Sequence, residues 1–103
     1  MDPNPTPKPN FLDAIGKLCY EGKEIAAYLY QVPDDQAQRQ RVREVLDAIL
    51  KEASPTKHRE LPRIADELRR SLDEPPSIAG ADLLQSGFEQ MIKIWMGGRS
   101  GLF

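Results

Sequence analysis

Hydrophobic residues recur at helical spacing in four separate stretches of this chain. The most hydrophobic stretch is 78–96, and its apolar positions are separated by four, three and four residues, which places them on one face of an α-helix. These positions are Leu84, Phe88, Met91 and Trp95. Ile92, Ile94 and Met96 lie outside that face. Because a helix that is apolar around most of its circumference needs neighbours on more than one side, we expect the earlier helices to pack around residues 78–96.

The first predicted helix follows Asn10, whose side chain suits an N-cap, and ends before Pro33. Its apolar seam consists of Phe11, Ile15, Leu18, Gly22, Ile25 and Leu29. A glycine inside a helix costs about 1 kcal/mol relative to alanine. We therefore expect Gly22 to mark a close approach by a neighbouring helix.

The second predicted helix is capped by Asp34 or Asp35 and begins with polar residues that have little to bury. Its apolar positions come later, at Val42, Val45, Leu46, Ile49 and Leu50. Across the turn, Tyr28 and Tyr30 fall off the first seam and face an Arg- and Gln-rich surface that includes Arg39. Tyr and Arg are enriched at the energetic centres of interfaces, so this end of the molecule is a candidate contact surface. The alternative is that both tyrosines only close the bundle end, with their hydroxyl groups in water.

Prolines and small polar residues set the limits of the last two helices. Pro62 is tolerated only near the first turn of a helix, so the third helix should begin close to Glu60 or Leu61. Its single apolar stripe consists of Leu61, Ile64, Ala65, Leu68 and Leu72. Pro75 and Pro76 close it, Ser77 caps the fourth helix, and Gly97 and Gly98 should end that helix.

These elements predict an all-α fold, a small four-helix up-down bundle over residues 11–97. The short connections at Pro33 and at Pro75–Pro76 favour antiparallel neighbours. Residues 1–10 alternate prolines with polar residues and are expected to form a flexible Pro-rich arm, and 98–103 should be a short C-terminal tail. The expected core is Phe11, Ile15, Leu18, Ile25, Leu29, Val42, Leu46, Ile49, Leu61, Ile64, Leu68, Leu72, Leu84, Phe88, Met91 and Trp95.

Composition narrows the function classes only slightly. At 103 residues the chain has room for one domain, and its net charge of -2 argues against nucleic-acid binding, which needs clustered Lys and Arg. The segment 38–70 has nine basic and six acidic residues. Arg39, Arg41 and Arg43 fall within it, but only Arg39 and Arg43 share a helix face. A nucleic-acid-binding helical domain is therefore the weaker alternative.

The single cysteine and the polar leader favour a cytoplasmic protein. Cys19 cannot form an intramolecular disulfide, and no secretory hydrophobic region follows Met1. No apolar run approaches the ~20 residues that cross a bilayer, so no membrane association is expected. Cys19 lies beside the first seam and is interpreted as a small buried hydrophobe rather than as a nucleophile.

His58 is the only histidine and hence the one candidate phosphoacceptor. The segment 58–62 loosely resembles the histidine, acidic residue and proline of the kinase-dimerisation motif in two-component signalling. Its spacing is one residue shorter, and the Lys-Gly pair that follows the histidine in phosphotransfer domains is absent. Pro62 also disfavours a continuous helix through His58. A histidine phosphotransfer-like signalling domain is thus an alternative, against an exposed linker histidine without a special role.

No set of residues assembles a catalytic, cofactor or metal site. One histidine, one cysteine and scattered carboxylates do not provide the three or four ligands of a metal centre. Adjacent carboxylates such as Asp66 and Glu67 point about 100° apart on a helix, so they do not form a facing acid–base pair. We therefore expect no enzyme activity, no cofactor and no metal.

The leading hypothesis is a non-catalytic protein–protein interaction module, an adaptor or regulatory domain whose partner is another protein. Self-association into a homo-oligomer is left open. The candidate interaction surface consists of Tyr28, Tyr30, Arg39, Ile92, Ile94 and Met96. The last three either complete the core or form a docking surface.

Overall fold

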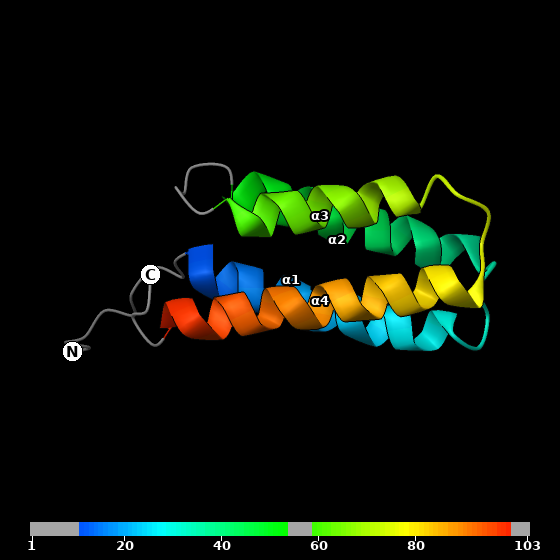
Figure 1. Ribbon diagram of the computed structural model, residues 1–103, viewed down its shortest axis with the longest axis horizontal. Helices are drawn as coiled ribbons and strands as arrows, with labels where there is room; N and C mark the ends of the chain where they lie inside the picture. The colour runs from blue at the N-terminus through cyan, green and yellow to red at the C-terminus, as the bar shows by residue number, and fades with distance from the viewer. Residues whose placement is uncertain (1–10, 54–58, 100–103) are drawn as a thin grey trace, which may run out of the picture.

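The computed structural model describes residues 11–53 and 59–99, and within these ranges the chain forms four helices and no strand. They are α1 (Phe11–Leu29), α2 (Gln36–Ala53), α3 (Glu60–Ser71) and α4 (Ile78–Arg99). Successive helices run in opposite directions along one long axis (Figure 1). The predicted all-α, up-down four-helix bundle is confirmed.

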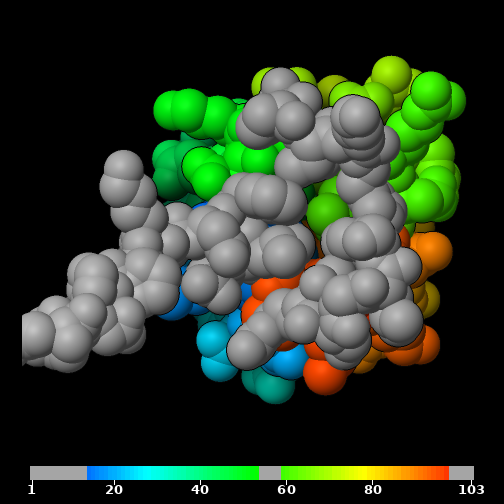
Figure 2. All heavy atoms as spheres, turned by 90° about the vertical axis from the view of Figure 1, so that its left-hand side faces the viewer, coloured from blue at the N-terminus to red at the C-terminus, as the bar shows by residue number. Residues whose placement is uncertain are grey.

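The four helices occupy the corners of the bundle, as the end-on view of Figure 2 shows. Neighbours in sequence pack together, and α1 also packs on α4, which closes the ring. In the described residues, the backbones of the diagonal pairs, α1 with α3 and α2 with α4, do not approach closely. Of the earlier helices expected to surround residues 78–96, α1 and α3 pack directly on α4, whereas α2 lies diagonally across the bundle from it.

Local sequence signals account for most of the helix limits. Asp35 caps α2, since its Oδ1 accepts the amide hydrogen of Gln38 at 3.1 Å. Ser77 caps α4 in the same way, and the amide nitrogen of Gly80 lies 2.9 Å from its hydroxyl oxygen. α3 begins at Glu60, which leaves Pro62 in the first turn, as predicted.

The end of α4 differs from the prediction. The helix runs through Gly97 and Gly98 to Arg99. A glycine ends a helix by adopting the left-handed conformation, and Gly97 does not adopt it. Residues 1–10 and 100–103, the predicted arm and most of the predicted tail, lie outside the described residues.

The core agrees closely with the predicted set. Thirteen of the sixteen predicted positions are buried, and Leu18 and Trp95 are partly buried. The side chain of Phe11 lies outside the described part. Cys19 is fully buried, as predicted. Further buried residues are Ala26, Val45, Ala53, Ala65, Ala81 and Ile92.

Glycines bring α4 close to both of its neighbours. A Cβ atom at Gly22 would collide with the ring of Phe88, so the absence of a side chain lets α1 and α4 approach. Gly16 makes the same room for the indole of Trp95. On the other side of α4, a Cβ atom at Gly87 would lie 2.6 Å from a methyl carbon of Leu68 in α3. The prediction that Gly22 marks a close helix approach is confirmed.

Candidate functional site

The structure divides the six predicted surface residues between the two ends of the bundle. Tyr28, Tyr30 and Arg39 lie where the α1–α2 and α3–α4 connections meet, at the right of Figure 1. Ile92, Ile94 and Met96 lie in the last turns of α4, towards the other end.

The three α4 residues do not form a continuous apolar surface. Ile92 is buried in the core and Ile94 is half-buried against it, whereas Met96 is exposed. These residues were expected either to complete the core or to form a docking surface, and Ile92 completes the core. Its inclusion in an interaction surface is corrected accordingly.

The two tyrosines form hydrogen bonds that link neighbouring segments at this end of the bundle. The Tyr28 hydroxyl donates a hydrogen bond to Oδ2 of Asp35 at 3.0 Å, and the Tyr30 hydroxyl donates one to Asp82 in α4. Each bond to a carboxylate raises the pKa of the tyrosine that makes it. Tyr28 is exposed and Tyr30 is half-buried against the core.

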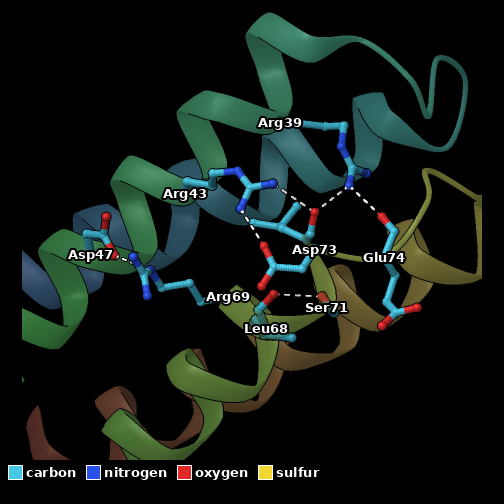
Figure 3. Close-up of polar contacts among 9 residues, drawn as sticks. Arg39, Arg43, Asp47, Leu68, Arg69, Ser71, Asp73 and Glu74 are labelled. Atoms are coloured by element: carbon cyan, nitrogen blue, oxygen red, sulfur yellow. Dashed lines mark hydrogen bonds and ion pairs between the residues drawn. The ribbon is translucent and has the colours of Figure 1, made fainter.

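Arg39 is not on the surface, which corrects the prediction. Its side chain is only 8% exposed, and the guanidinium crosses from α2 to the α3–α4 connection. There Nη2 donates to the carbonyl oxygens of Leu72 at 2.9 Å and Glu74 at 3.1 Å (Figure 3). The polar start of α2 thus buries a charged side chain, because the end of α3 folds back over it.

Arg43, one turn further along α2, also forms polar contacts with the C-terminal end of α3. Its Nη2 donates to the carbonyl oxygen of Leu72 at 2.8 Å, and its Nη1 lies 3.3 Å from Oδ1 of Asp73. Leu72 is the C-cap of α3, so two arginines face the negative end of that helix dipole, where cations are stabilised. Burial and the neighbouring Arg43 both lower the pKa of Arg39.

Exposed apolar residues surround this connection and form what we call the α3–α4 patch: Pro75, Pro76, Ile78, Ala79 and Leu83. Ile78 is 61% exposed and Leu83 is 49% exposed, the first and third most exposed of the large hydrophobic residues in the described part. The sequence interpretation missed this patch. The adjacent pair Leu83 and Leu84 could have indicated it, because two neighbours on a helix cannot both face one core stripe.

A pocket of about 230 Å³ opens beside the patch. Arg39 lies on one side of it, the first turns of α4 lie on another, and apolar side chains supply most of the wall. The apolar lining residues include Leu72, Pro75, Leu83 and Leu84. A buried guanidinium beside an apolar pocket combines the two kinds of contact that small binding sites use.

The remaining arginines do not form a basic surface for nucleic acid. Outside Arg39, five of the arginines in the described part each pair with a carboxylate, so their charges are largely offset locally. The pairs are Arg41 with Glu21, Arg43 with Asp73, Arg63 with Glu60 and Glu67, Arg69 with Asp47, and Arg70 with Asp66. This arrangement does not favour binding to phosphates, which needs clustered and available cations.

Burial governs the chemistry of Cys19. Desolvation raises the pKa of its thiol to about 12. Because the thiolate is the reactive form, this cysteine stays protonated and unreactive near neutral pH. In 11–53 and 59–99, no group of three or more His, Cys, Asp or Glu side chains is arranged to hold a metal ion. Over the same ranges, none of the helices has the length and apolar character needed to cross a bilayer.

His58 lies outside the described residues, so its candidacy as a phosphoacceptor stays a prediction from the sequence. No family model, curated protein or solved structure matches this chain.

Proposed function

We propose that this chain is a non-catalytic protein-interaction module that binds a partner protein through the α3–α4 patch. The observation that carries the proposal is the exposure of Ile78 and Leu83 beside Pro75 and Pro76. Exposed apolar residues are common when single, but a group of them rimmed by polar residues is typical of a docking surface.

The surroundings of the patch support a rigid docking site. Arg39 and Arg43 hold the carbonyl oxygens of the connection, and the Ser77 cap fixes the start of α4. A surface that is already ordered loses less conformational entropy when a partner binds. Tyr28, exposed at the same end of the bundle, adds the kind of aromatic side chain that interfaces favour.

Site-specific photo-crosslinking tests the proposal. A benzophenone amino acid at Leu83 should capture a partner protein from extracts of the source cells, whereas the same probe at Lys93, exposed and further along α4, should not. The partner is then purified and its affinity measured. Leu83→Lys should weaken binding at least about tenfold, because it places a charge in an apolar contact.

Equal crosslinking at both positions, or an unchanged affinity of Leu83→Lys for the captured protein, would contradict the proposal. Light scattering of the purified chain separates a different partner from a second copy. A crosslinked product with twice the mass of the chain would identify self-association through the patch.

A further inference from the structure

Arg39 is a buried cation whose charge is only partly balanced. Its two hydrogen bonds go to neutral carbonyl oxygens, and no carboxylate of the described residues lies within 4.0 Å of it. The Glu74 carboxylate points away from the guanidinium in Figure 3. Arginine is rarely this buried without an anionic partner. The negative end of the α3 dipole supplies about half an elementary charge.

The guanidinium has donors left for a ligand. It carries five N–H hydrogens, and both of its bonds to the α3–α4 connection use Nη2. The N–H groups of Nε and Nη1 have no acceptor among the described residues, and Arg39 lines the neighbouring pocket. Each of these two groups can donate one charge-assisted hydrogen bond to a carboxylate oxygen, because both two-bond forks of a guanidinium include Nη2, which already donates to Leu72 and Glu74.

The rest of the pocket fits a carboxylate attached to an aliphatic group. Its volume of about 230 Å³ can hold several water molecules, or one small side chain together with the side chain of an adjacent residue. The walls at Pro75, Leu83 and Leu84 are apolar. The start of α4 borders the pocket at Ala79, and the positive end of a helix dipole favours an anion there.

The charges around the pocket disfavour a polyanion. Asp73, Glu74 and Asp82 are exposed at this end of the bundle, and Glu74 also lines the pocket. Their repulsion grows with each negative charge that a ligand carries. Asp73 pairs with Arg43, and Asp82 accepts a hydrogen bond from the Tyr30 hydroxyl. Neither of these carboxylates is paired with Arg39. One isolated carboxylate is therefore favoured over a phosphate chain.

We propose that the pocket beside Arg39 binds an aspartate or glutamate side chain that is flanked by an aliphatic residue in the partner polypeptide. This inference rests on the proposed function, because it assigns the partner chemistry at the α3–α4 patch. The aliphatic residue packs on Leu83 and Pro75, and the carboxylate accepts a hydrogen bond from Arg39.

The test uses two short peptides that differ in one group, N-acetyl-Leu-Glu-amide and N-acetyl-Leu-Gln-amide, titrated into the isotope-labelled full chain. In NMR spectra, the Glu peptide should shift the amide signals of Ala79, Gly80 and Leu83, with a dissociation constant on the order of 1 mM. The Gln peptide should bind about tenfold more weakly, because it lacks the charge that strengthens the hydrogen bonds.

Three variants locate the binding. Arg39→Met should abolish the difference between the two peptides, whereas Arg41→Met, which removes an exposed arginine of the same helix, should preserve it. Ala79→Leu keeps Arg39 and should abolish binding of both peptides by filling the pocket wall. This variant keeps the test valid if Arg39→Met does not fold.

Equal affinity for the Glu and Gln peptides, no shifts at the pocket, or stronger binding of a single-stranded DNA oligonucleotide than of the Glu peptide would each overturn the assignment. These outcomes leave the crosslinking result at Leu83 intact, so failure of the carboxylate site and failure of the interaction module are distinguishable. A loss of crosslinking at Leu83 together with retained peptide binding would instead indicate a small-molecule carboxylate site.

Discussion

The α1–α4 contact and the α2–α3 contact join antiparallel helices of the same bundle by different means. Between α1 and α4, the rings of Phe88 and Trp95 fit against Gly22 and Gly16, so shape determines the approach. Between α2 and α3, apolar packing is supplemented by Arg39 and Arg43 on the α3 terminus and by an ion pair of Arg69 with Asp47 at 2.6 Å (Figure 3).

The difference indicates which part of the molecule can change without loss of the fold. Where an aromatic ring occupies the space beside a glycine, there is no room for another carbon atom, because protein interiors are close-packed. Long arginine side chains at a helix end can adjust, and their bonds are individually modest. The proposed binding site lies at the end of the polar contact, where side chains can meet a ligand without opening the core.

The largest expected effect is on the apolar contact. Phe88→Ala should lower the free energy of unfolding by about 3–5 kcal/mol, because it removes a fully buried ring and leaves a cavity against Gly22. Urea denaturation followed by circular dichroism measures the change. Leu83→Ala, at a half-exposed position of the same helix, is the control and should have a much smaller effect. Equal losses in the two variants would mean that Phe88 does not anchor α4 on α1.

Gly22→Ala should be destabilising although alanine is the better helix former. Overpacking against Phe88 costs about 1–3 kcal/mol, and the gain in helix propensity of about 1 kcal/mol offsets only part of it.

The matched control is Gly97→Ala, because no heavy atom lies within 4 Å of a Cβ atom there. It should stabilise the protein by up to about 1 kcal/mol. Changes of the same sign in the two variants would contradict the steric account of Gly22.

Removing one arginine from the polar contact should have an intermediate effect. Arg39→Met is expected to lower the free energy of unfolding by about 1–2 kcal/mol, since two charge-assisted hydrogen bonds are lost while Arg43 still donates to Leu72. Arg41→Met removes an exposed pair with Glu21 and should change stability by less than about 1 kcal/mol. A stabilised Arg39→Met would mean that the burial of the charge outweighs its bonds.

The smallest effect concerns pH. The bond to Asp82 raises the pKa of Tyr30 above its ordinary value of 10.0, so the folded state favours the protonated phenol. Its contribution to stability is fully present below pH 10 and is lost as the pH rises through the raised pKa. Tyr30→Phe should therefore flatten the decline of the urea midpoint above pH 10. Burial of Cys19 adds its own alkaline decline to both proteins and cancels in the comparison. Parallel pH profiles would rule out the Tyr30 contribution.

Much of the candidate site could not be predicted from the sequence, for a specific reason in each case. The cap at Ser77 and the role of Pro62 depend on the next few residues, and both predictions were confirmed. Arg39 was placed on the surface because arginine in a polar stretch is usually solvated. Its burial depends on Leu72 and Glu74, more than thirty residues away.

The sequence by itself determined the four helices, the faces they bury and their alternating directions, because apolar periodicity, caps and prolines act over one or two helical turns. It also determined that Gly22 meets a neighbour, since an interior glycine needs a compensating contact. Only the tertiary structure decided that α4 packs directly on two helices while the third lies diagonally opposite, that it continues through Gly97, and that Arg39 and Leu83 border one pocket. These features depend on which distant segments share a corner of the bundle, and local periodicity carries no information about that.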